Sequence, residues 1–281
     1  MLADCVGSLL RQSLAPDRFE IVVVDDASTD ATVETVRELS ERTAPPRISL
    51  VRHEFPRGPN ACRNSGFAAA GSDLFCFIDD DVLVPEPWLD AVLRGAERYP
   101  QALCLGGPIR LRLEGTPPRH CGGESLSEGE FDAGPDDREV VEVYSGNMVV
   151  RRVALDVAGQ FDEELPIYHE ETEWESRLRA RGGLIMYVAD AWLWHRRTAD
   201  QLRLHDMVRR RFRNGVGYAS AASARNERVS ARRALRRLPR LAAHGLRRRC
   251  WWGALGAAYQ LGVAYGALRP RSGRESLGGG G

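Results

Sequence analysis

Three consecutive aspartates end an apolar run in the stretch DLFCFIDDDVLVPEPW, residues 73–88. Asp79, Asp80 and Asp81 follow residues 74–78, and more apolar residues come next. Two like charges about 4 Å apart repel by roughly 4 kcal/mol at an effective dielectric near 20, so a partly buried triplet needs a compensating charge. Carboxylate oxygens suit Mg²⁺ or Mn²⁺. The triplet therefore predicts a divalent-metal site, with a solvated turn as the alternative.

A second acidic pair, Asp25 and Asp26, ends the β-branched run FEIVVVDD of residues 19–26. In open parallel sheets, ligands bind beyond the carboxyl ends of the strands, which is where both acidic groups are expected. Turn or helix-capping chemistry before Ser28, Thr29 and Asp30 is the alternative for this pair.

The elements that position these acids alternate between strand and helix. Periodicity predicts strands at 19–26, 47–53 and 73–78, and helices after Ser28, at 58–71 and at 85–100. Trp174 and Leu178 lie at i, i+4 in a further predicted helix. The alternation indicates an α/β fold with a largely parallel sheet.

Residues 114–139 are rich in Gly, Pro and acids and predict a flexible loop. The chain divides into a half at 1–108, a second half at 109–200 and a basic helical tail at 201–281. The tail holds 18 of the 39 basic residues and 3 of the 39 acidic ones, so a net charge of zero conceals an acidic body and a basic tail.

The six cysteines show no C-x-x-C pair and no metal-ligand spacing, which predicts reduced thiols in a cytoplasmic protein. The N-terminus lacks the basic region and the long apolar segment of a signal peptide. Nothing in the sequence indicates a nucleic-acid partner.

Five stretches, in order, resemble the family 2 glycosyltransferases: SLLRQSLAPDRFEIVVVDDASTDAT, RGPNACRNSGFAAAGSDLFCFIDDDV, YSGNMVVRRVALDVAGQFDEEL, HEETEWESRLRARGG and AWLWH. The resemblance implies a GT-A-type three-layer αβα sandwich and metal-dependent, inverting transfer of a sugar from a nucleotide-diphosphate donor to an acceptor hydroxyl. That acceptor would belong to a polysaccharide, a lipid or another glycoconjugate. Residues 1–108 would bind the nucleotide sugar, and residues 109–200 would bind the acceptor.

The resemblance also implies roles at the donor. Asp26, with Asp25 beside it, would contact the nucleoside, and Arg63 would lie near the diphosphate. Asp79 and Asp81 would form the D-x-D motif for Mg²⁺ or Mn²⁺, with Asp80 at the donor between them.

Two further residues take roles from the same resemblance. His195 would be the third protein ligand of the metal, although a lone His after an apolar stretch is often structural. Asn147, in SGNMVV, would hold substrate, and a turn role is its alternative.

The catalytic base is expected within HEETEWESRL, where Glu171 takes the family's base position with Glu170 and Glu173 on either side. Four glutamates in six residues crowd like charges, which raises carboxylate pKa values toward those of a general base. An acidic first helical turn, stabilised by the helix dipole, is the alternative.

The apolar residues 251–268 lie between the arginines of 247–249 and those of 269–271. Eighteen residues are borderline for crossing about 30 Å of hydrocarbon. The arginine flanks and the Trp pair favour a helix on an anionic membrane surface, at the inner face of the cell membrane, over a helix packed on the catalytic domain.

Two other functions stay open: a sugar nucleotidyltransferase, and a non-catalytic protein that binds sugar nucleotides. The chain also opens inside the helix that should follow the first strand of a βαβ unit. That strand is expected to be missing, through a misassigned start or a true truncation, and the misassigned start is favoured.

Overall fold

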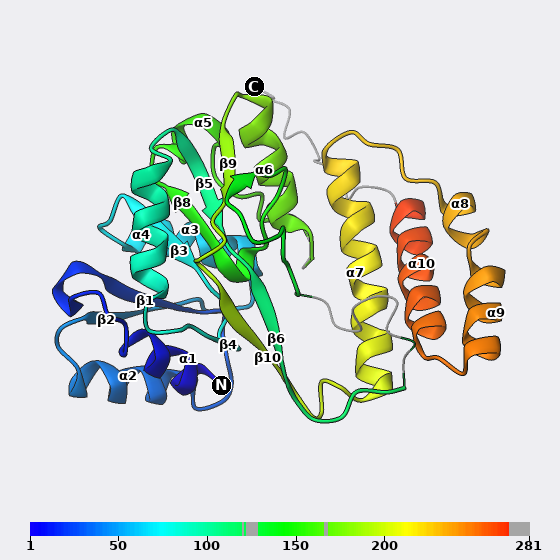
Figure 1. Cartoon of the computed structure of the whole chain (residues 1–281), viewed down its shortest axis with the longest axis horizontal. Helices are drawn as coiled ribbons and strands as arrows, with labels where there is room; N and C mark the ends of the chain where they lie inside the picture. Colours follow the sequence, from blue (N-terminus) through cyan, green and yellow to red (C-terminus); the bar gives the residue numbers. More distant parts are fainter. Residues whose placement is uncertain (120, 122–128, 166–167, 270–281) are drawn as a thin grey trace, which may run out of the picture.

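The computed structural model describes residues 1–119, 121, 129–165 and 168–269. It consists of an α/β body, which ends with strand β10 (Leu193–Thr198), and a group of helices that lies beside the body (Figure 1). The α/β class and the helical C-terminal region predicted from the sequence are confirmed.

The N-terminal part of the body contains a small parallel sheet. Its elements are α1 (Leu2–Leu9), the 3-10 turn Pro16–Arg18, β1 (Glu20–Asp25), α2 (Thr32–Arg42), β2 (Arg47–Arg52) and α3 (Pro59–Ala69). Strands β1 and β2 pair in parallel, and α2 supplies the crossover that parallel strands require. Asp25 is the last residue of β1, so the acidic pair lies at the carboxyl end of the strand, as predicted.

The central sheet has five strands in the order β3-β8-β5-β9-β7. Their bounds are β3 (Leu74–Phe77), β5 (Ala102–Gly106), β7 (Arg138–Glu139), β8 (Met148–Arg151) and β9 (Leu184–Tyr187). Among these described strands, β5 and β9 pair in parallel and the other three pairs are antiparallel. The sheet is thus mixed rather than largely parallel. Strand β8 follows a long connection rather than a crossover helix, and such a connection does not require β8 to run parallel to its neighbours.

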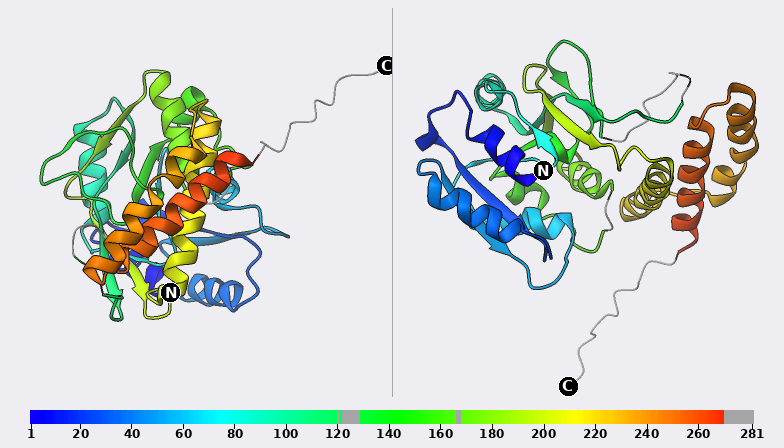
Figure 2. Two further views of the ribbon diagram at one scale, coloured as in Figure 1. Left: turned by 90° about the vertical axis from the view of Figure 1, so that its right-hand side faces the viewer. Right: turned by 90° about the horizontal axis from the view of Figure 1, so that it is seen from below.

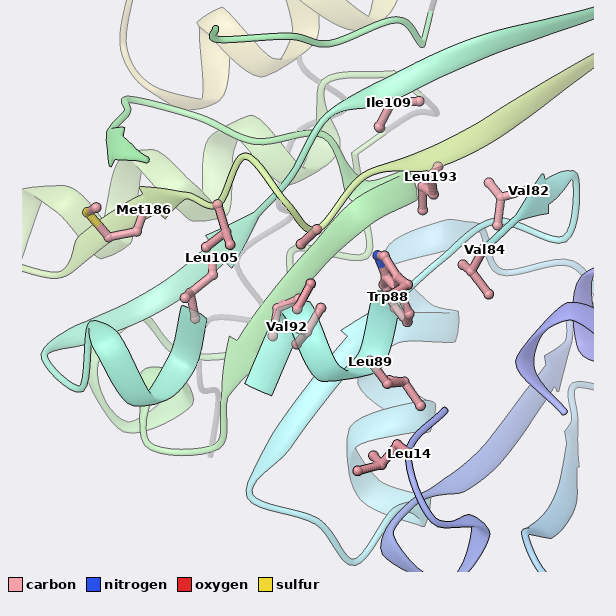
Figure 3. Packing of buried hydrophobic residues seen from close by; sticks show 14 of the residues in the cluster. Leu14, Val82, Val84, Trp88, Leu89, Val92, Leu105, Ile109, Met186 and Leu193 are labelled. Carbon is pink, nitrogen blue, oxygen red and sulfur yellow. The ribbon is translucent and has the colours of Figure 1, made fainter. Parts of the chain in front are cut away.

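Successive residues of a strand point to opposite faces of the sheet, so the central sheet has side chains to bury on both faces. Helices cover both. Leu105 of β5 and Val149 of β8 pack with α4 (Trp88–Arg98), where Trp88 is buried among apolar residues (Figure 3). The residues next to Leu105 and Val149 in sequence pack on the opposite face with α3 and α6 (Glu170–Ala180), near the short α5 (Ala154–Ala158). The three-layer arrangement follows from this alternation.

A third, three-stranded sheet completes the body in the order β4-β10-β6. Strand β4 spans Val82–Leu83 and β6 spans Ile109–Glu114. Strand β10 pairs with both, and its register sets His195 opposite Val82, next to the aspartate triplet. Strands from residues 1–108 and 109–200 therefore share sheets and cores.

Part of the predicted loop 114–139 is well packed. Phe131 exchanges two backbone hydrogen bonds with Ile109, and the Tyr187 hydroxyl donates to Asp132 at 3.0 Å. These contacts hold residues 129–139 against the body. Residues 120 and 122–128 of the same stretch lie outside the described residues.

The C-terminal helices are α7 (Leu204–Ala224), α8 (Ala231–Leu235), α9 (Leu238–Arg248) and α10 (Trp252–Leu268). Helix α10 packs between α7 on one side and α8 and α9 on the other (Figures 1 and 2). A Cβ atom on Gly262 would lie 2.0 Å from the carbonyl oxygen of Phe212, so the close approach of α7 and α10 requires glycine. The apolar stretch 251–268 is thus largely covered by protein. Within the described residues, no helix is long and apolar enough to cross a membrane.

Candidate active site

The aspartate triplet forms the connection between β3 and β4, and β10 lies beside it. The backbone N–H of Arg196 donates to the carbonyl oxygen of Asp81 at 2.9 Å. This bond, with the pairing of β4 and β10, brings the alternate side chains of His195 and Arg197 to the triplet. The site therefore depends on residues more than 110 positions apart in the chain.

Asp81 contacts two buried basic side chains. Its Oδ1 lies 2.9 Å from His195 Nε2, and its Oδ2 accepts a hydrogen bond from Arg197 Nη1 at 3.0 Å. Burial opposes ionisation of Asp81, but His195 and the charge of Arg197 outweigh it and lower the pKa of the carboxyl. Asp81 is therefore a carboxylate at neutral pH.

His195 lies between Asp81 and Arg197. Its Nε2 lies 2.6 Å from Arg197 Nη1, and its Nδ1 lies 3.3 Å from Arg197 Nη2 and 3.3 Å from the carbonyl oxygen of Gly129. The buried Oδ1 of Asp81 lies beside this ring and has no hydrogen-bond partner among the described residues.

The residues present fit a divalent cation. Ligand atoms of Asp79, Asp81 and His195 all lie within 4.8 Å of one another. The buried Oδ1 of Asp81, which has no hydrogen-bond partner among the described residues, is a group that a cation would satisfy. Two carboxylates and a neutral imidazole are ligands that Mn²⁺ and Mg²⁺ accept.

Asp79 and Asp80 are exposed on the open side of the site, yet the surrounding chain still removes water from them. This desolvation, with the charges of Asp81 and Asp80, raises the pKa of Asp79, while His195 and Arg63 oppose the rise. Desolvation and the charge of Asp81 likewise raise the pKa of Asp80. The crowding of like charges that the sequence predicts is thus present among the three aspartates. Asp79 also lies close to Gly146.

Asp25 and Asp26 occupy different environments. Asp25 is buried; its Oδ1 accepts from the Ser28 N–H at 3.0 Å and its Oδ2 lies 3.2 Å from Arg52 Nε. These are the bonds of a turn and an ion pair.

Asp26 is more exposed, at 28% of its side chain, and anchors the loop after β2. It accepts from His53 Nδ1 at 2.7 Å and from the N–H groups of Arg57 and Gly58 at 2.8 Å. Burial raises its pKa, but these three hydrogen bonds outweigh burial and lower the pKa of Asp26. Asp26 is therefore held as a carboxylate that still reaches solvent.

Arg63, on α3, links the two acidic regions of the site. Its guanidinium donates to Asn60 Oδ1 at 2.6 Å and to Glu170 Oε1 at 3.1 Å. Burial and the charge of Glu171 raise the pKa of Glu170, and Arg63 opposes this rise. The charge of Arg63 also opposes the rise in the pKa of Asp79.

The glutamates of α6 differ in how completely they are engaged. Glu173 forms two hydrogen bonds with Arg177, at 2.7 and 2.9 Å. Glu175 is fully buried and accepts from the Val143 N–H at 2.8 Å, and burial raises its pKa well above the ordinary value. Glu171 is half-buried and accepts a long bond of 3.5 Å from the Ser145 N–H. Glu171 is therefore the least constrained of them.

Asn147 is buried, and its amide bonds the protein itself. It donates to the carbonyl oxygens of Ala191 and Pro108 and accepts from the indole N–H of Trp88. These bonds hold together the chain segments that contain Trp88, Pro108 and Ala191.

Two residues of the site, His53 and Arg197, were not predicted from the sequence, and only their position near the acidic motifs in the folded chain identifies them.

Solved structures of the same fold are glycosyltransferases. The mannosyltransferase PcManGT from Pyrobaculum calidifontis, solved with GDP-Man and Mn²⁺, has a TM-score of 0.58 and 16% identity. The similarity covers 96% of this chain and 72% of that one. The chain therefore has the GT-A glycosyltransferase fold.

The family follows from the sequence match. The Glycosyl transferase family 2 model matches residues 1–158, and the chain belongs to this family. It is 36% identical over 108 residues to validoxylamine A glucosyltransferase of Streptomyces hygroscopicus subsp. limoneus, covering 38% of this chain and 23% of that protein. It is 29% identical over 218 residues to the O-antigen biosynthesis protein RfbC of Myxococcus xanthus, covering 72% of this chain and 16% of that protein. The chain thus spans less than a quarter of these relatives.

Replacing Glu175 with Gln tests the buried carboxyl of α6. Since its native pKa is raised, the folded state holds a proton that the unfolded chain releases, and wild-type stability falls as pH rises above the ordinary pKa of 4.5. Glu175→Gln removes this loss, so the variant should gain unfolding free energy relative to wild type between about pH 5 and about pH 8 in urea titrations. Exposed Glu139→Gln is the control. A constant difference for Glu175→Gln across this range would contradict the assignment.

Proposed function

We propose that this chain transfers a glycosyl group, with inversion, from a nucleotide-diphosphate sugar to an acceptor hydroxyl. The acceptor oxygen forms a bond to the anomeric carbon while the bond to the diphosphate oxygen breaks, and its electron pair leaves on the diphosphate. The hydroxyl proton passes to a carboxylate. The convergence of Asp79, Asp81 and His195, in a chain of this family, is the observation that carries the proposal.

Asp26 and Arg63 are the proposed donor-binding residues. Asp26 is a partly exposed carboxylate that is rigidly held by backbone N–H groups, which suits an acceptor of hydrogen bonds from a nucleoside. Asp25 supports it from the turn. Arg63 pairs with Glu170 and its charge opposes the rise in the pKa of Asp79, so this charge would orient the diphosphate.

Asp79, Asp81 and His195 would hold Mn²⁺ or Mg²⁺, with exposed Asp80 at the donor. When bound, the ion offsets the negative charge that develops on the leaving diphosphate. The lowered pKa of Asp81 keeps its carboxyl ionised, as a metal ligand must be, and Nε2 of His195 lies 2.9 Å from its Oδ1.

Glu171 is the proposed general base. The other three glutamates of α6 are unsuited: Arg63 binds Glu170, Arg177 binds Glu173, and Glu175 is fully buried. Glu171 keeps one long hydrogen bond and solvent access, so it can accept a proton from a hydroxyl placed above the donor.

The C-terminal helices are proposed to bring the enzyme to an anionic membrane surface, where a lipid-linked or glycan acceptor would be met. A pocket of about 460 Å³ is lined by Arg211, Arg237 and Arg240 together with aromatic side chains, a composition that suits lipid phosphate. Leu246, Trp251 and Leu268 are exposed apolar residues that could enter the interface.

Asp81→Asn should abolish Mn²⁺-dependent binding of the donor while leaving the fold intact, because the amide cannot replace a carboxylate ligand. Calorimetric titration with UDP-, GDP- and dTDP-sugars, with and without Mn²⁺, measures this. The matched control is Asp73→Asn, since Asp73 is a fully exposed aspartate at the other end of β3. Normal Mn²⁺-dependent binding by Asp81→Asn would show that the metal lies elsewhere.

Glu171→Gln should keep donor affinity and lower turnover by at least about a hundredfold, the usual scale of general-base removal. Release of the nucleoside diphosphate measures turnover. Glu173→Gln breaks the pair with Arg177 and should lower the thermal midpoint more than the turnover of folded protein. Loss of turnover in Glu173→Gln, with none in Glu171→Gln, would instead make Glu173 the general base. Binding of donor by wild type without any turnover would favour the non-catalytic alternative.

Full-length protein should float with anionic vesicles and sediment with neutral ones. Changing Arg236, Arg237 and Arg240 to Gln should weaken flotation, because these side chains are exposed on α9 and in the turn that precedes it. Three exposed arginines of the body, Arg18, Arg37 and Arg94, changed to Gln in the same way, form the control. Equal flotation of both variants would exclude the proposed surface.

A further inference from the structure

Two cysteines and a histidine that are distant in sequence meet at one end of the helical group. The ligand atoms of Cys121, His244 and Cys250 all lie within 4.8 Å of one another. Cys121 Sγ is 3.4 Å from His244 Nε2, and the Cys121 N–H donates to Cys250 Sγ at 3.2 Å. The sequence spacing of the cysteines gave no sign of this cluster, because its members come from segments 123 and 129 residues apart.

The turn between α9 and α10 positions Cys250 and His244. Arg249 adopts a left-handed conformation (φ 47°), and the Cys250 N–H closes the turn by donating to the Gly245 carbonyl oxygen at 3.1 Å. A Cβ on Gly253 would meet the backbone of Gly245 at 2.8 Å, so the two helices approach closely here. The hairpin therefore directs Cys250 inward, beside the last turn of α9.

Contacts on either side hold the ligands in place. The ring of His244 packs edge-on against Trp252, with ring centroids 4.9 Å apart. The Trp251 N–H donates to the carbonyl oxygen of Arg119 at 3.1 Å, which fixes the segment that carries Cys121 to the start of α10. Backbone bonds thus determine the approach of Cys121 to the hairpin, in addition to its side-chain contacts.

We propose that Cys121, His244 and Cys250 bind a Zn²⁺ ion. Tetrahedral zinc with bonds of about 2.3 Å to sulfur and about 2.0 Å to nitrogen separates a sulfur and a nitrogen ligand by about 3.5 Å, close to the 3.4 Å between Cys121 Sγ and His244 Nε2. Each thiol loses its proton on binding, and the two thiolates balance the charge of the ion. A solvent oxygen takes the fourth position.

The soft ligand set distinguishes this site from the carboxylate site of the catalytic body. Thiolates select zinc, whereas carboxylate-rich sites accept Mn²⁺ or Mg²⁺. The ion would tie the segment after β6 to the α9–α10 hairpin, which joins the body to the helical group. The site is independent of glycosyl transfer, so its test does not depend on activity.

The test measures bound zinc in the full-length protein, purified under reducing conditions and dialysed against metal-free buffer. Elemental analysis should find one zinc per chain, and Co²⁺ in its place should give the absorption of a tetrahedral thiolate complex. Cys121→Ser, Cys250→Ser and His244→Ala should each weaken zinc binding at least about tenfold. Cys121 is exposed, so its substitution does not disturb packing.

His205→Ala is the matched control, since His205 is exposed on α7 and pairs with Asp206. It and Asp81→Asn should both retain zinc. Substoichiometric zinc in wild type, unchanged affinity in Cys121→Ser, or a Cys121–Cys250 disulfide in the freshly reduced and dialysed protein would each overturn the proposal.

Discussion

Repulsion within the aspartate triplet is the constraint on which the rest of the site depends. Three carboxylates in succession between β3 and β4 need positive charge, and the fold supplies part of it through Arg197. Arg197 and His195 reach the triplet because β10 pairs with β4 in one register. A shift of one residue would turn both side chains to the other face. The register of β10 against β4 and β6 therefore controls the electrostatics of the site.

The same constraint explains why the halves of the body are not separable. The triplet belongs to the first half, but its counter-charges, the Gly146 backbone against which Asp79 rests and the glutamates of α6 belong to the second. Asn147 holds the two halves together through hydrogen bonds to Pro108, Ala191 and Trp88. Arg63 of the first half pairs with Glu170 of α6 in the second. The residues proposed to act on the donor and on the acceptor would thus belong to one packed body.

Much of the fold could be predicted from periodicity. The helix at Glu170–Ala180 follows from Trp174 and Leu178, and the strand at Leu74–Phe77 from its apolar run. The antiparallel direction of β8 could not be predicted, since it depends on tertiary packing after a long excursion. Arg197 was missed because an arginine in a chain with 39 of them carries no local signal. The cluster around Cys250 was missed because its ligands come from separate segments.

Anomalous X-ray scattering from crystals grown with Mn²⁺ and a nucleoside diphosphate would locate the proposed metal. One Mn²⁺ is expected, bound by carboxylate oxygens of Asp79 and Asp81 and by Nε2 of His195, in contact with the diphosphate. An ordered diphosphate in the site without Mn²⁺, with Arg197 still bonded to both Asp81 and His195, would contradict it. In that case the positive charge for the leaving group would come from arginine alone.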